Sequence, residues 1–230
     1  MNMRNTVNFL IKGLTLLLIT TQISHAGGIV IGQTRVIYDA DKKEAALSIT
    51  NNSESNPFLI QSWVDTGESK THGPFVVTPP LFRINPQEEH TLRISYTDAQ
   101  LPKDKESLFY INVRAIPSSK KGSTNELKLV VKTRLKLFYR PKGLAGSAAE
   151  AYKLLTFTRS GGQLHIHNPT SFYVTFSSLK AGNSVLSQVE MIAPQSAIDI
   201  PLDRNNSGNT VRWSAITDYG GGNVVQQRTL

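Results

Sequence analysis

Apolar and polar side chains alternate regularly through residues 126–140 of the chain. The odd-numbered positions from 127 to 137 are apolar except for Thr133, and the even-numbered positions are mostly cationic. The apolar members are Leu127, Leu129, Val131, Leu135 and Leu137. A period of two is typical of a β-strand with one apolar face and one polar face. These fifteen residues exceed the usual strand length of about five or six. The pattern therefore predicts a strand that projects beyond its sheet and leaves apolar side chains uncovered, as expected of an edge that binds a partner.

Short alternating or apolar runs, separated by Gly and Pro, fill most of the remaining chain. They predict strands over residues 32–38, 44–51, 57–64, 75–77, 81–85, 90–96, 108–115, 154–158, 163–167, 172–179, 184–189, 197–201, 210–217 and 224–228. Evenly spaced short strands with turn residues between them are typical of antiparallel β-sandwiches. A helical period is nearly absent, and a single helical turn is expected within residues 148–155. The fold class is therefore predicted to be all-β.

A change of composition near the middle of the chain indicates two domains. Pro141 and Gly143 follow the long alternating run, and residues 144–149 are small and do not alternate. Pro and Gly together after a strand favour a connecting segment. We expect two tandem β-sandwich domains, over residues 27–144 and 145–230.

The first 26 residues have the three regions of a secretory signal. Arg4 and Lys12 come first, an apolar stretch follows over residues 13–19, and Ser24 and Ala26 lie three and one positions before Gly27. The apolar stretch is shorter than the roughly 20 residues that a membrane-spanning helix needs. Residues 1–26 are therefore predicted to be a cleaved signal peptide of an exported protein.

Composition removes several classes of function. The chain has no cysteine, which excludes disulfides, thiol catalysis and Cys-ligated zinc. After residue 26 it has 23 basic and 17 acidic residues, a net charge of +6, but the basic residues are spread along the chain and form no tract suited to nucleic acid. His165 and His167 share a strand face without an evident third ligand, so no metal site is expected. Phosphate-binding loops, H-E-x-x-H segments and G-x-S-x-G elbows are absent, and we expect neither an enzyme nor a cofactor.

Two long segments resemble a known family. Residues 101–117, LPKDKESLFYINVRAIP, and residues 133–141, TRLKLFYRP, are similar to the signature segments of the PapD-like periplasmic pilus chaperones. Shorter matches follow in the family's order at Thr34-Arg35, Thr78-Pro79-Pro80, Asn168-Pro169 and Asp218-Tyr219-Gly220. The resemblance covers essentially the whole chain after residue 26. It implies two immunoglobulin-like domains set at an angle like a boomerang, and the short gap between Pro117 and Leu127 places the chain in the short-loop branch.

The resemblance also implies how such a protein works. Pilus subunits are incomplete sandwiches, and the chaperone lends them a strand, a process called donor-strand complementation. By resemblance, Leu127, Leu129 and Val131 are the donor side chains, and Arg35 and Lys136 grip the terminal carboxylate of the subunit. The residues alone leave an alternative open, in which the three apolar side chains fill the core of their own domain.

Two further groups of residues have roles that only the resemblance implies. Glu106, Arg140 and Asp218 match a charged cluster at the junction of the two domains, where it would set the angle between them. Pro57 and Pro79 match a proline pair that would gate the donor strand.

The expected partners follow from the same resemblance. They are pilus subunits, both pilins and adhesin, and an outer-membrane usher, with the chaperone acting in the periplasm without a cofactor. The uncovered edge also leaves open a self-capping oligomer of the free chaperone. The alternative function is a structural or adhesive β-sandwich component of a pilus. Such a subunit would carry an N-terminal donor extension, for which only Ile29 and Ile31 are available before Gln33.

Overall fold

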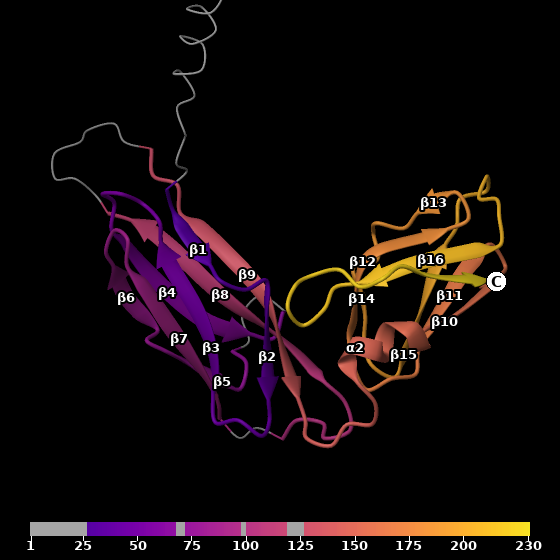
Figure 1. The fold of residues 1–230 in the computed structure, drawn as a ribbon, viewed down its shortest axis with the longest axis horizontal. Coiled ribbons are helices and arrows are strands. Elements are labelled where there is room, and N and C mark those ends of the chain that lie inside the picture. The colour runs from indigo at the N-terminus through magenta and orange to yellow at the C-terminus, as the bar shows by residue number, and fades with distance from the viewer. Residues whose placement is uncertain (1–26, 68–71, 98–99, 119–126) are drawn as a thin grey trace, which may run out of the picture.

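Two β-sandwiches joined at one end make up the fold, as Figure 1 shows. The computed structural model describes residues 27–67, 72–97, 100–118 and 127–230. The predicted signal peptide, residues 1–26, lies outside the described residues. The two sandwiches diverge from their shared end, so the molecule has the shape of a V (Figure 1). The predicted all-β class and the predicted arrangement at an angle are both confirmed.

The first sandwich consists of a four-stranded and a five-stranded sheet. The four-stranded sheet has the order β1 (Ile29–Ile31), β3 (Ala45–Asn51), β7 (Glu89–Tyr96) and β5 (Phe75–Thr78). The five-stranded sheet has the order β2 (Arg35–Asp39), β9 (Val131–Arg140), β8 (Ser107–Pro117), β4 (Phe58–Asp65) and β6 (Leu81–Ile84). β2 and β9 pair in parallel. Alternate side chains of each strand enter the core between the sheets, where Leu47, Ile60 and Ile111 are fully buried.

The second sandwich faces the first across the V. One sheet has the order β10 (Thr156–Ser160), β11 (Gln163–Asn168) and β15 (Ser196–Pro201). The other has the order β13 (Ser184–Val185), β12 (Val174–Ala181), β16 (Thr210–Ala215) and β17 (Gln226–Thr229), and β14 (Met191–Ile192) also pairs with β12. Trp213 lies in the core, and its indole N–H donates to the carbonyl oxygen of Tyr152 at 2.8 Å. Each sandwich therefore has its own apolar core.

A short helical segment follows the connection between the sandwiches. It consists of α2 (Ala148–Ala151) and a 3₁₀ turn (Tyr152–Leu154). The Ser147 hydroxyl caps α2 by accepting a hydrogen bond from the backbone N–H of Ala149 at 3.3 Å. The helical turn expected within residues 148–155 is confirmed. The predicted boundary between residues 144 and 145 falls in this connection, where Leu144 packs against the second core.

Some strands differ from those predicted. β1 was not predicted, because Ile29 and Ile31 form too short a run to indicate a strand; β1 pairs with β3 inside the first sandwich. The run predicted over residues 184–189 ends at Val185, and β14 follows as a separate strand.

The long strand also differs, since β9 begins at Val131 rather than at residue 126. Residue 126 lies outside the described residues, and residues 127–130 have no strand structure. The last register pair of β8 and β9 is Ala115 with Val131. Pro117 follows two residues later and has no backbone N–H to continue the ladder. The register pairing of β8 with β9 therefore ends at Val131.

Candidate functional site

A row of uncovered apolar side chains marks the edge of the first sandwich. Leu127, Leu129 and Val131 are 87%, 72% and 60% exposed, whereas Leu137, which has the same parity in β9, is fully buried. The three predicted donor side chains therefore lie outside the core of their own sandwich, and the alternative in which they fill it is wrong. Their role as donors stays a prediction. Adjacent apolar side chains at this level of exposure are suited to a partner that covers them.

Arg35 and Lys136, the predicted carboxylate anchor, lie side by side. They are register neighbours in the parallel pairing of β2 and β9. Arg35 is buried, and its Nη1 donates to the carbonyl oxygen of Ile216 at 3.4 Å. Its guanidinium also lies 5.9 Å from the centre of the Phe138 ring. Two cations from neighbouring strands thus project from one face of the sheet, toward the second sandwich.

Burial and neighbouring charges shift the pKa of Arg35 in opposite directions. Burial lowers the pKa of Arg35, while the negative charges of Asp218 and Glu190 act to raise it. A guanidinium stays protonated in proteins despite such shifts. Arg35 is therefore a partly desolvated cation, which strengthens its attraction for an added carboxylate.

The two cations line a hollow between the sandwiches. Its volume is about 820 Å³ with the open solvent that it includes; the first sandwich contributes Thr34, Arg35, Tyr110, Arg134 and Lys136, and the second contributes Thr175, Phe176, Glu190, Ile216 and Gly220. The Nζ of Lys136 forms an ion pair with the carboxylate of Glu190. Among the described residues, the buried Nε of Arg35 and Oγ1 of Thr175 have no hydrogen-bond partner. The hollow therefore has both charge and unused hydrogen-bonding capacity for a carboxylate.

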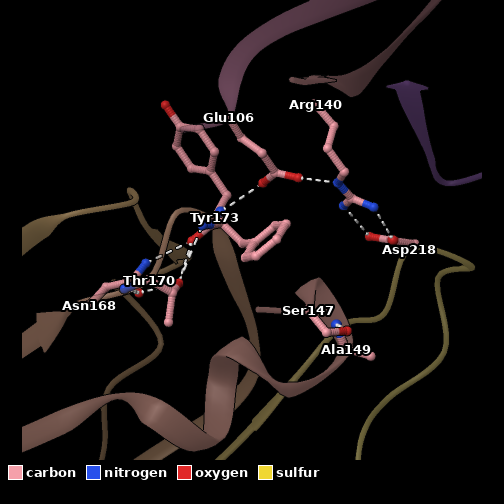
Figure 2. Close-up of polar contacts among 9 residues, drawn as sticks. Glu106, Arg140, Ser147, Ala149, Asn168, Thr170, Tyr173 and Asp218 are labelled. Carbon is pink, nitrogen blue, oxygen red and sulfur yellow. Dashed lines mark hydrogen bonds and ion pairs between the residues drawn. The ribbon is translucent and has the colours of Figure 1, made fainter. Parts of the chain in front are cut away.

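Glu106, Arg140 and Asp218 meet at the junction of the two sandwiches, as Figure 2 shows. The Nε of Arg140 donates to Glu106 at 2.7 Å, and its two terminal nitrogens donate to the two oxygens of Asp218 at 2.8 and 3.0 Å. The second oxygen of Glu106 accepts from the backbone N–H of Tyr173 at 2.8 Å, and the backbone N–H of Glu106 donates to the carbonyl oxygen of Ser171 at 2.9 Å. Residues of the first sandwich are thus tied to two separate segments of the second.

The surroundings of this cluster are nearly dry. Glu106 is 4% exposed. Burial raises the pKa of Glu106, and the charge of Arg140 acts against that rise. The pKa of Arg140 is raised, because its hydrogen bonds and charge interactions with Asp218 and Glu106 outweigh burial, which alone would lower it. Removal of Arg140 would therefore leave the buried carboxylate of Glu106 without its cation.

The turn at Asp218 also brings the two sandwiches into close contact. Gly220 has a φ of +87°, and a Cβ at this position would clash with the hydroxyl oxygen of Thr34. Only glycine combines this backbone conformation with such a close approach. The Asp218-Tyr219-Gly220 motif therefore places Asp218 opposite Arg140.

Pro57 and Pro79 are not brought together. The carbonyl oxygen of Pro79 accepts from the hydroxyl of Ser62 at 3.2 Å, and that of Pro57 accepts from the backbone N–H of Ser118 at 3.3 Å. Ser62 lies five residues after Pro57 along β4, which corresponds to about 16 Å. The two prolines are therefore not in contact with each other, and their role as a gate for the donor strand stays a prediction.

The other sequence candidates lie away from the cleft. His165 pairs with Asp199 across β11 and β15, and His167 lies opposite Ala197. Within the described ranges, no group of three or more His, Asp or Glu side chains is arranged to hold a metal ion. None of the helices among the described residues has the length and apolarity to cross a bilayer.

Sequence reasoning missed two acidic residues that pair with cations of the cleft. Glu190 pairs with Lys136 from the other sandwich, and Asp65 holds Arg134 at 2.8 Å. Neither residue belongs to a recognisable motif, and each meets its cation across more than 50 residues of chain. Periodicity gives no signal for such pairs.

Fold and site together define a class of protein: two immunoglobulin-like sandwiches that enclose a cation-lined cleft, with an uncovered apolar segment at one edge. Comparison with known sequences gives the family. Residues 28–145 match the N-terminal domain of PapD, described as a pili and flagellar-assembly chaperone, and residues 150–227 match the C-terminal domain of the pili assembly chaperone PapD. The chain belongs to this family of pilus-assembly chaperones.

Individual relatives agree with this assignment. The chain is 42% identical over 210 residues to the probable fimbrial chaperone LpfB of Escherichia coli O157:H7, covering 90% of each protein. It is 43% identical over 198 residues to the chaperone FimC of Escherichia coli K12, covering 84% of this chain and 80% of FimC. Among solved structures, the Salmonella enterica SafA pilin in complex with the SafB chaperone matches with a TM-score of 0.80 at 31% identity, over 88% of this chain and 96% of the matched chain.

Proposed function

We propose that this chain is a periplasmic chaperone that binds pilus subunits by donor-strand complementation and delivers them to an outer-membrane usher. The observation that carries the proposal is the exposure of Leu127, Leu129 and Val131, which lie in the segment just before β9 and at its first residue. A subunit that lacks one strand has an open groove, and an added strand satisfies both its backbone and its apolar core. The process consumes no nucleotide.

The donor segment meets the needs of strand addition. Residues 127–130 have no strand structure of their own, so this segment can adopt the strand conformation that pairing with a subunit requires. Side chains two residues apart leave a strand on the same face. Each fully buried Leu or Val contributes roughly 1.5–3 kcal/mol, so three such side chains supply a substantial share of the affinity.

Arg35 and Lys136 would fix the register of the bound subunit. A terminal carboxylate held by both cations makes charge-assisted hydrogen bonds. Lys136 lies five residues beyond Val131 along the strand, which is about 17 Å. The anchor therefore determines which groove of the subunit each donor side chain enters, and the tie between Arg140, Glu106 and Asp218 holds the second sandwich over that anchor.

Co-expression with the pilus proteins encoded beside this chain tests the proposal. We expect a one-to-one complex with a pilin or an adhesin in the periplasmic fraction, identified by pull-down and mass measurement. Recovery of the chain inside assembled fibres would instead support a structural pilus component. Recovery from the cytoplasm alone would contradict the proposed location.

A further inference from the structure

The anchor of this chain already contacts a carboxylate, which comes from the other sandwich. Glu190 forms an ion pair with Lys136, and its negative charge also acts on Arg35. The same two cations that are proposed to bind the subunit's terminal carboxylate are thus engaged by one of the chain's own. Glu190 belongs to no motif and has no role in the proposed function.

The backbone holds Glu190 in this place. Its carbonyl oxygen accepts a hydrogen bond from the N–H of Phe176 at 2.9 Å. Glu190 immediately precedes β14, which pairs with β12 through Val174 and Thr175. The position opposite Lys136 is therefore determined by strand pairing in the second sandwich.

The exposures of the two side chains show how the contact can be exchanged. The side chain of Lys136 is 13% exposed, whereas that of Glu190 is 76% exposed. Glu190 thus reaches the cation from the solvent side of the cleft, and an ion pair with an exposed member is weak. A carboxylate that also uses Arg35 and the unpartnered Thr175 hydroxyl would make more contacts than Glu190 makes.

We infer that Glu190 is an internal occupant of the carboxylate anchor, which a subunit's terminal carboxylate displaces when it binds. This inference rests on the proposed function. In the free protein Glu190 neutralises Lys136 and links the two sandwiches across the cleft. Subunit binding exchanges that link for a contact with the subunit. Glu190 therefore lowers the affinity of the anchor for the subunit, and it occupies Lys136 whenever no subunit is bound.

The test uses Glu190→Gln, which removes the charge and keeps the shape of the side chain. The probes are two synthetic peptides with the C-terminal sequence of the pilin that co-purifies with the wild-type chain, one a free acid and the other a carboxamide. The matched control is Glu150→Gln, which makes the same change of net charge at an exposed pair with Lys153 in the helical segment. Binding is measured by calorimetry for the wild type, both variants, Lys136→Ala, and Glu190→Gln combined with Lys136→Ala.

We expect Glu190→Gln to bind the acid peptide about two- to fivefold more tightly than the wild type, because an exposed ion pair no longer competes. Glu150→Gln should match the wild type. When Lys136 is already replaced by Ala, Glu190→Gln should tighten binding of the acid peptide very little, because Glu190 then has no ion pair with Lys136 to lose. In a carbon NMR spectrum, the carboxyl signal of Glu190 should move toward that of a solvated glutamate as the acid peptide is added.

Three results overturn the inference. Unchanged or weaker binding by Glu190→Gln would show that Glu190 does not compete, and an equal gain in the Lys136→Ala background would show that it does not act through Lys136. Equal binding of acid and carboxamide by the wild type would instead overturn the proposed anchor, and the inference with it. A clear preference of the wild type for the acid, without any gain in Glu190→Gln, would overturn the inference alone.

Discussion

At the scale of single residues, the cleft is governed by cations that lie against oxygen acceptors from distant parts of the chain. Lys136 contacts Glu190, and Arg140 contacts Glu106 and Asp218. Arg134 contacts Asp65 and also lies 4.0 Å from the centre of the Tyr110 ring. Each contact restricts a long side chain to one direction, so the positive charges of the cleft have fixed positions.

Lys136→Ala should leave the protein folded and exported but should weaken subunit binding. Loss of a charge-assisted hydrogen bond costs about 1.5–3 kcal/mol, or roughly ten- to 150-fold in dissociation constant. Pull-down and calorimetry with the co-expressed pilin measure the effect. Lys180→Ala, an exposed strand lysine of the second sandwich, is the control. Full binding by Lys136→Ala would refute the anchor.

Asp65 should make stability depend on pH. Burial acts to raise the pKa of Asp65, but hydrogen bonds from Arg134, Gly67 and Asn112 outweigh it and hold the pKa below its usual range. A lowered pKa in the folded state contributes stability above the unfolded pKa of about 4, and this contribution is lost as the pH falls through the folded value.

Asp65→Asn should therefore reduce the free energy of unfolding by about 2 kcal/mol at pH 7, because the amide nitrogen cannot accept the bond from Asn112 or Arg134. The difference from the wild type should shrink below about pH 4. Urea unfolding at several pH values measures it, with the exposed Asp41→Asn as the control. If the difference in free energy of unfolding between Asp65→Asn and the wild type does not change with pH, the lowered pKa of Asp65 is not the cause of the pH dependence.

At the scale of elements, the proposed donor segment and β9 show how one alternating run is exposed at one end and buried at the other. The alternation is the same on both sides of Val131, yet Leu129 is 72% exposed and Leu137 is fully buried. The difference lies in the neighbours: β2 pairs with β9 only from Lys136 onward, and β8 pairs with it only as far as Val131. The sequence predicted a strand that is too long for its sheet but did not show which of its leucines is covered.

Substitution to glutamate at two positions of this run should separate the two roles. Leu129→Glu should abolish the subunit complex and change the free energy of unfolding by less than about 0.5 kcal/mol, as expected for a surface site. Leu137→Glu should prevent folding, because it places an unpaired charge in the core.

Thermal unfolding and pull-down measure both effects. Val185 on β13 is also apolar and exposed. Val185→Glu should therefore change neither the stability nor the subunit binding. If Leu129→Glu unfolds the protein, then Leu129 belongs to the core and the donor assignment fails.

At the scale of the whole molecule, the two cores are separate, and polar contacts together with the packing of Phe138 against Tyr173 join the sandwiches at the junction. The bidentate bond from Arg140 to Asp218 and the contacts of Glu106 with Tyr173 and Ser171 cross the junction. Gly220 allows the second sandwich to approach Thr34. We therefore predict that these charged contacts at the junction set the angle of the V.

Arg140→Ala should loosen the angle between the sandwiches. It leaves Glu106 buried without its cation, which costs about 3–5 kcal/mol for a buried pair. Small-angle scattering should show a broader distribution of interdomain distances, and subunit binding should fall although the donor segment is intact. Lys142→Ala, which removes an exposed cation only two residues away, should leave the scattering curve unchanged. An unaltered curve for Arg140→Ala would show that other contacts set the angle.

The sequence by itself determined the all-β class and the apolar face of the long run, because alternation is a local property of the chain. The pairing of Arg35 with Lys136 was implied only by the resemblance to the pilus chaperones. Only the tertiary structure decided that Leu127, Leu129 and Val131 lie uncovered, that Glu190 faces Lys136, and that Pro57 and Pro79 are apart. Burial and ion pairing depend on which distant strand lies beside a residue. Strand pairing sets that neighbour, and the pattern along one strand does not contain it.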